Sequence, residues 1–328
     1  MAATRPKKRK SPSGKPQSGK SGRPRGNPQK RPAAAPPEPA RLGDWIGAAR
    51  LRTLPLAIAP VLIGTGAALL VDRALHWVIA LACLVVALAL QIGVNFANDY
   101  SDGIRGTDDF RVGPQRLTAS RKASPRAVLT AALVFFGVAA VAGLAIVVRT
   151  QHWWMLAVGT ACIVAAWFYT GGKRPYGYAG LGELFVFVFF GLVATVGTTF
   201  VQVGYVPQES WFGGVAVGLL AVAVLLANNL RDVEQDRAAG KRTLSVRIGA
   251  RGTQVLFTVI VLVPFVILAL FALFYPRAWV GMLTLIPLAA ATLIVWTFRQ
   301  PRELVVALSL TSLSALAYAA FVFWAFAA

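Results

Sequence analysis

Two short segments hold most of the acidic side chains that follow the first 40 residues. Seven of the twelve Asp and Glu residues in that part lie in them: Asp99, Asp102, Asp108 and Asp109 in the first, and Asp232, Glu234 and Asp236 in the second. Each segment directly follows a long apolar stretch. Acids close to membrane depth are costly and usually mark an ion or substrate site. The two segments are therefore where we expect the chemistry.

The acids and their neighbouring amides are spaced to share a helical face. If the apolar helices continue through both segments, the i, i+3 and i+4 relations predict two polar ladders. These are Asn95, Asp99 and Asp102 on one helix, and Asn228, Asp232 and Asp236 on the other. Facing carboxylates repel each other unless cations lie between them, and oxygen ligands favour a hard divalent ion such as Mg²⁺. Because Mg²⁺ usually keeps positions for phosphate oxygens, we expect a phosphorylated substrate.

Basic residues expected on the same side of the membrane could hold that phosphate. Arg105, Arg111 and Arg116 follow the first ladder, Lys241 and Arg242 follow the second, and Lys173 and Arg174 lie in the connection after the fourth apolar stretch. The alternative is a pair of ordinary solvated loops whose charges neutralise each other, but such loops do not require Asn and Asp at helical spacing. A histidine or cysteine metal site is not indicated, because the two histidines and two cysteines are widely separated.

The composition is that of a membrane protein. Of 328 residues, 56% are hydrophobic and only 14% are charged, which excludes a soluble globular enzyme. A bilayer core about 30 Å thick needs about 20 apolar residues in a helix. The sequence therefore predicts an all-α bundle of nine transmembrane helices, near 54–71, 77–97, 128–148, 153–170, 181–203, 211–230, 254–274, 279–297 and 304–327.

The distribution of charge predicts an orientation in the cell membrane. With a cytoplasmic N-terminus, 30 of the 33 Lys and Arg lie inside, and only Arg73, Arg149 and Arg277 lie outside together with the C-terminus. Residues 1–40 contain 11 of the basic residues, nine prolines and no Val, Ile, Leu, Phe, Trp or Tyr. We expect a disordered cytoplasmic tail that contacts anionic lipid, followed by one membrane domain over 41–328. Nucleic-acid binding is not expected, because no aromatic residues interleave with the tail charges.

Several segments resemble the UbiA superfamily of intramembrane aromatic prenyltransferases. Asn98-Asp-Tyr-Ser-Asp102 and Asp232-Val-Glu-Gln-Asp236 are similar to its two aspartate-rich motifs. Four longer stretches resemble the branch that prenylates 1,4-dihydroxy-2-naphthoate in menaquinone synthesis; they begin at Arg50, Asn98, Gly172 and Asn228. The first motif departs from the usual pattern, since Gly106 stands where its last aspartate is expected and Asp108 follows.

The resemblance implies a nine-helix fold, Mg²⁺ as cofactor, and polyprenyl diphosphate and 1,4-dihydroxy-2-naphthoate as substrates. It implies that Asp99, Asp102, Asp232 and Asp236 are catalytic metal ligands, with Asp108 as a further ligand. It also places eight residues near the substrates: Asn98, Arg105, Arg116, Lys173, Tyr176, Asn228, Lys241 and Arg242. Two alternatives stay open, namely a UbiA-type enzyme with another aromatic acceptor and a transporter of divalent cations or phosphate. A transporter would have its acids near mid-membrane, whereas these lie at the helix ends.

Overall fold

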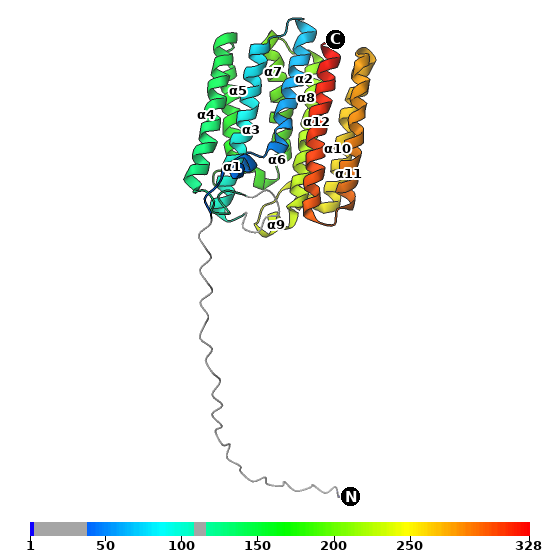
Figure 1. The fold of residues 1–328 in the computed structure, drawn as a ribbon. Helices are drawn as coiled ribbons and strands as arrows, with labels where there is room; N and C mark the ends of the chain where they lie inside the picture. Colours follow the sequence, from blue (N-terminus) through cyan, green and yellow to red (C-terminus); the bar gives the residue numbers. More distant parts are fainter. Residues whose placement is uncertain (3–37, 108–115) are drawn as a thin grey trace. The chain divides into compact units, whose positions relative to one another are not determined.

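A computed structural model describes residues 1–2, 38–107 and 116–328 of the chain. Most of the predicted tail, residues 3–37, lies outside the described residues, and so does Asp108. The division of the chain into a tail and a membrane domain at residue 40 stays a prediction. Within the described part the chain folds into helices without strands, arranged as a bundle of roughly parallel and antiparallel helices (Figure 1). The prediction of an all-α membrane protein is confirmed.

All nine predicted stretches coincide with helical segments. They are α2 (Pro55–Val71), α3 (Trp77–Arg105), α4 (Pro125–Thr150), α5 (Met155–Phe168), the run α6 (Gly182–Val186), η3 (Phe187–Val193) and α7 (Ala194–Val203), α8 (Gln208–Arg231), α10 (Leu244–Phe274), η4 (Pro276–Thr284) with α11 (Leu285–Thr297), and η5 (Pro301–Glu303) with α12 (Leu304–Phe326). Four short helices lie outside them: α1 (Leu42–Ala48), η1 (Leu51–Thr53), η2 (Tyr176–Ala179) and α9 (Val233–Ala238).

Length and composition support fewer than nine complete spans. Among the described residues, seven helices are long and apolar enough to cross a membrane, and the segment 42–71 adds an eighth if its two halves, bent by 47°, form one span. The helix α5 is apolar but has only 14 residues. It is about 21 Å long, shorter than the hydrocarbon core of a bilayer. Nine spans therefore stay a prediction.

Close helix contacts in the bundle depend on glycine. Gly64 of α2 lies against α7, where an added Cβ atom would approach the carbonyl oxygen of Thr195 to 2.5 Å. Gly191 lies in η3, a π-helical turn, and an added Cβ there would stand 2.6 Å from the Cα atom of Gly218 on α8. Because real Cβ atoms do not approach so closely, these glycines let the helices pack at short range.

The two acidic segments lie at the same end of the bundle. The helix α3 continues through Asp99 and Asp102 to Arg105, while α8 ends at Arg231 and a break at Asp232 leads into α9. Figure 1 shows α1 and α9 at this end and the C-terminus of α12 at the other end. We call this end of the bundle, where both acidic segments lie, the acidic end.

Candidate active site

A cavity of about 430 Å³ runs into the bundle from the acidic end. Its walls come from α2, α3, α4, α5, the α6–η3–α7 run and α8. Along α3 the lining extends from Asp102 to Cys83, 19 residues that correspond to about 28 Å of helix. Charged side chains line the acidic end, whereas the lining between α4, α5 and α7 consists mainly of small and apolar residues. The cavity therefore joins a charged mouth to a long apolar body.

The polar face of α3 differs from the predicted ladder. The polar residues of α3 that line the cavity are Gln91, Asn95, Asn98 and Asp102, and Asp99 is not among the described lining residues. At about 100° of helical rotation per residue, those four residues cluster within about 60° of each other, while Asp99 points about 60° beyond the direction of Asp102. The predicted ladder of Asn95, Asp99 and Asp102 also spans about 60° of the helix, but its outermost member, Asp99, lies outside the cavity lining, and Gln91 and Asn98 extend the polar lining instead.

Asp99 instead holds the chain segment that follows α3. One carboxylate oxygen accepts the backbone N–H of Leu117 at 2.8 Å, and the other accepts that of Thr118 at 3.0 Å. The Asp99 side chain is almost completely buried, with 1% of its surface exposed. Arg116, the residue directly before Leu117, lies at the mouth of the cavity.

Asp102 is the centre of the polar network at the mouth. It accepts a hydrogen bond from the hydroxyl of Tyr178, and Arg116 donates to its other oxygen at 3.3 Å. The ammonium group of Lys241 lies 3.4 Å from Asp102 and 4.6 Å from the centre of the Tyr178 ring. Burial and then the charge of Asp102 raise the pKa of the Tyr178 hydroxyl, so it stays protonated and keeps its donor.

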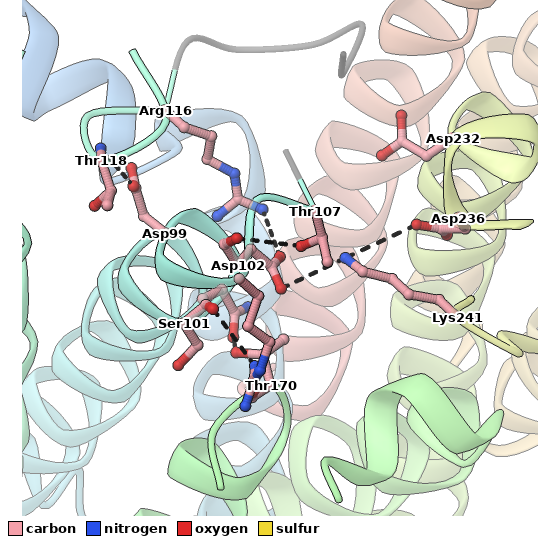
Figure 2. Close-up of polar contacts among 12 residues, drawn as sticks. Asp99, Ser101, Asp102, Thr107, Arg116, Thr118, Thr170, Asp232, Asp236 and Lys241 are labelled. Atoms are coloured by element: carbon pink, nitrogen blue, oxygen red, sulfur yellow. Dashed lines mark hydrogen bonds and ion pairs between the residues drawn. The ribbon is translucent and has the colours of Figure 1, made fainter. Parts of the chain in front are cut away.

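The second acidic segment faces the same space from α8 and α9. The Asp232 carboxylate accepts two hydrogen bonds of 2.7 Å from the Arg231 guanidinium. Arg231 also donates to the side-chain oxygen of Asn228 at 2.9 Å. Asp236 lies 3.9 Å from Lys241. Figure 2 shows Lys241 reaching between Asp102 and Asp236. A single lysine thus connects the acids of the two segments.

The donor set suits a metal that arrives with its own oxygen ligands. Among the described residues no three acidic, histidine or cysteine side chains are close enough to hold a metal by themselves. Asp102, Asp232 and Asp236 nevertheless line one cavity, and Asn98 and Asn228 add amide groups beside them. Mg²⁺ commonly uses one or two carboxylates and completes its shell with phosphate oxygens and water, so these residues fit it.

Sequence comparison identifies the family. Residues 57–326 match the UbiA prenyltransferase family. The chain belongs to this family. It is 50% identical over 281 residues to the 1,4-dihydroxy-2-naphthoate octaprenyltransferase of Mycobacterium tuberculosis (strain ATCC 25618 / H37Rv), which covers 85% of this chain and 95% of the relative.

Solved structures share the UbiA fold. The apo structure of a UbiA homologue from Aeropyrum pernix K1 matches with a TM-score of 0.62 at 14% identity, covering 85% of this chain and 98% of that one. A UbiA homologue from Archaeoglobus fulgidus bound to GPP and Mg²⁺ matches with a TM-score of 0.57 at 16% identity, covering 86% and 99%.

The predicted substrate residues of this UbiA-family chain fall into two groups. Five of them line the cavity: Asn98, Arg116, Tyr176, Asn228 and Lys241. Three lie outside its lining: Arg105, Lys173 and Arg242. The Arg105 side chain donates to the backbone carbonyl oxygens of Thr170 and Gly172. The backbone N–H of Arg242 donates to the backbone carbonyl oxygen of Tyr178. Asp108 lies outside the described residues, so its predicted role as a ligand is not tested.

Several residues that build the UbiA site were not predicted as site residues. Tyr178 and Thr170 belong to the connection between α5 and α6. The Thr170 hydroxyl donates to the side-chain oxygen of Asn98 at 2.7 Å. Arg231 is the buried partner of Asp232. The sequence signal for Arg231 was its position directly before an aspartate in a polar ladder. No spacing rule indicated the contacts of Tyr178 and Thr170, because they join segments more than 70 residues apart.

We predict that Asp99 stabilises the fold through the Leu117 and Thr118 N–H groups. In Asp99→Asn the side chain loses its charge, and its NH₂ group replaces one of the two oxygens that accept a backbone N–H. Two donors then face each other and one hydrogen bond is lost, which should lower the free energy of unfolding by about 1.5–3 kcal/mol. Unfolding in mixed detergent micelles measures this. The control is Glu234→Gln, which weakens an exposed pair with Arg237 and should change stability by less than about 0.5 kcal/mol. Equal stabilities of the two variants would contradict the role of Asp99.

Proposed function

We propose that this protein transfers a polyprenyl group from polyprenyl diphosphate to 1,4-dihydroxy-2-naphthoate, with loss of the ring carboxylate as CO₂, to give demethylmenaquinol, the reduced form of demethylmenaquinone, for menaquinone biosynthesis. The observation that carries the proposal is the cavity, in which a mouth lined by three carboxylates, with Arg116 and Lys241 beside them, opens into an apolar body. A cavity with a charged mouth and a long apolar body is complementary to a prenyl diphosphate, which has a charged head and a long apolar chain. The half-identical naphthoate octaprenyltransferase supports the choice of acceptor.

Asp102, Asp232 and Asp236 are the carboxylates that we propose for Mg²⁺, with Asn98 and Asn228 beside them. Bound Mg²⁺ would neutralise the charge that develops on the departing diphosphate. Asp99 acts through the segment that it holds rather than as a ligand. Asp108, beyond the described residues, keeps its proposed place as a further ligand.

The cations at the mouth would bind the diphosphate. In the structure Lys241 and Arg116 neutralise Asp102, so the carboxylate and the phosphate compete for the same donors. When the diphosphate enters, both cations can turn to its oxygens and leave Asp102 to the metal. Arg105 fixes the backbone at Thr170 and Gly172. Lys173 and Arg242 are exposed, and we propose that they attract the anionic substrates before binding.

The reaction requires no base from the protein. The bond between the allylic C1 atom and the diphosphate oxygen breaks, and the ring carbon that bears the carboxylate forms the new bond to C1. The electron pair of the carbon–carboxylate bond returns to the ring as CO₂ leaves, so the leaving group is CO₂ instead of a proton. The apolar walls of the cavity keep water from the allylic cation, and Tyr176 lies in that wall.

We further propose that the protein resides in the cell membrane with the acidic end in the cytoplasm. Both substrates are then reached from the cytoplasm, while the apolar body lies among the spans. The excess of Lys and Arg in the connections at this end supports the orientation through the positive-inside rule.

We predict Mg²⁺-dependent formation of a prenylated naphthoquinol by the purified protein. EDTA should abolish the product, and Asp102→Asn or Asp232→Asn should lower kcat/KM by about 10²-fold or more, because charge stabilisation of the departing diphosphate is lost. The matched control is Glu234→Gln, an exposed acid in the same segment as Asp232, which should retain wild-type activity. Full activity in EDTA would refute the proposal, as would a product formed only with 4-hydroxybenzoate or homogentisate.

We predict opposite accessibility for the two ends of α8 in intact cells. In a background carrying Cys83→Ala and Cys162→Ala, a membrane-impermeant maleimide should label Gln208→Cys, because Gln208 is exposed at the outer start of α8. It should label Glu234→Cys on α9 only after the membrane is permeabilised. The reverse pattern would show that the acidic end faces outward.

A further inference from the structure

Below the charged mouth, two buried polar side chains join α6 to α8. The Asn229 amide N–H donates to a carboxylate oxygen of Glu183 at 2.9 Å, and each side chain has 7% of its surface exposed. Of the two, only Asn229 lines the cavity. The metal and diphosphate roles proposed above use neither residue. A buried acid therefore holds an amide at the cavity wall without a part in binding the donor.

The hydrogen bond fixes which end of the Asn229 amide faces the cavity. One N–H points to Glu183, behind the wall, and an amide is planar with its oxygen on the side opposite the NH₂ group. The carbonyl oxygen is thereby directed away from Glu183. An amide oxygen at a cavity wall accepts a hydrogen bond from a hydroxyl group of a bound molecule.

The depth of Asn229 corresponds to that of the reacting carbon. It precedes Asp232 by three residues on α8, which places it about 4.5 Å further into the bundle. A diphosphate held at Asp232 would have its C1 atom at about this level. The acceptor ring must lie beside C1, so its hydroxyl groups reach the same level.

Aromatic side chains line the cavity next to this pair. The rings of Tyr169 and Tyr176 meet edge to face with centroids 5.5 Å apart, and the Tyr176 ring stacks on Phe185 at 4.0 Å. All three residues line the cavity. The Tyr169 ring also lies against Gly182, the residue before Glu183. Flat apolar rings beside one polar acceptor form a surface suited to a planar hydroxylated ring.

We infer that Asn229, oriented by Glu183, recognises a ring hydroxyl of the naphthoate acceptor, and that Tyr169, Tyr176 and Phe185 hold the ring. Asn229 is a substrate-binding residue, and Glu183 is a positioning residue that acts through it. The inference rests on the proposed function, since it names the acceptor site of that reaction. It makes the Glu183–Asn229 pair a determinant of acceptor specificity that is separate from the diphosphate site.

The test compares acceptor and donor kinetics in Asn229→Ala, Glu183→Leu and the isosteric Glu183→Gln. Asn229→Ala and Glu183→Leu should raise KM for 1,4-dihydroxy-2-naphthoate about tenfold, as expected for a lost hydrogen bond in a desolvated site, with KM for the prenyl diphosphate within about twofold of wild type. Glu183→Gln should give a KM for 1,4-dihydroxy-2-naphthoate between the wild-type value and that of Glu183→Leu. Glutamine can still accept a hydrogen bond from the Asn229 N–H, but its own NH₂ group also allows the reversed orientation of the Asn229 amide.

Acceptor analogues separate recognition from a merely structural role. Binding of 1-hydroxy-2-naphthoate and 4-hydroxy-2-naphthoate, measured by calorimetry without donor, should show one analogue whose affinity Asn229→Ala leaves unchanged, because that analogue lacks the recognised hydroxyl. The control is Gln254→Ala, which removes a buried amide of α10 bonded to the Val295 carbonyl and outside the cavity lining; all affinities should stay at wild-type values.

Equal losses for the full acceptor and both analogues would overturn the inference, as would KM values for donor and acceptor that rise together. If the wild-type protein prenylates the naphthoate and these variants lose affinity without such selectivity, only the acceptor site is refuted. If the wild-type protein forms no prenylated naphthoquinol, the proposed function itself fails.

Discussion

The site depends on neutralising acidic charge at the end of an apolar bundle. A buried carboxylate is stable only when opposite charge and hydrogen bonds replace water. Asp102 has Arg116, Lys241 and Tyr178 as such partners, and Asp232 has Arg231. The partners of Asp102 come from three different segments of the chain, whereas Arg231 directly precedes Asp232. Neutralisation of Asp102 therefore also brings distant segments together, and it places at the mouth the two cations that we propose for binding the diphosphate.

The apolar bundle and the charged mouth together define the substrate. The walls of the cavity follow α3 for most of its length, so a long hydrocarbon chain can lie parallel to the helices while its head stays at the acidic end. The π-helical turn η3 contributes Phe189 and Phe190 to that wall, and such turns are frequent at functional sites. In the proposed function, the donor head, the donor chain and the acceptor ring would each contact a chemically different surface of one cavity.

The sequence predicted the helices well because hydrophobic length dominates a membrane fold. It also predicted that Asp102, Asp232, Asp236 and Lys241 gather at one end, since parallel spans carry their ends to the same side. Helical spacing placed Asp99 on the same side of its helix as Asn95 and Asp102, but it did not reveal that the Asp99 carboxylate binds the segment around Leu117 and Thr118 instead of lining the cavity. Tyr178 and the Glu183–Asn229 pair require tertiary contacts that spacing cannot reveal.

Whether the carboxylates at the mouth hold a metal-bound diphosphate can be measured by pulsed EPR with Mn²⁺ in place of Mg²⁺ and an unreactive prenyl thiolodiphosphate. We expect a coupling between Mn²⁺ and the ³¹P nuclei of the analogue in the wild-type protein, and its loss when asparagine replaces Asp102 and Asp232 together. A ³¹P coupling that survives this double replacement, or its absence from the wild-type protein saturated with the analogue, would contradict this role of the carboxylates.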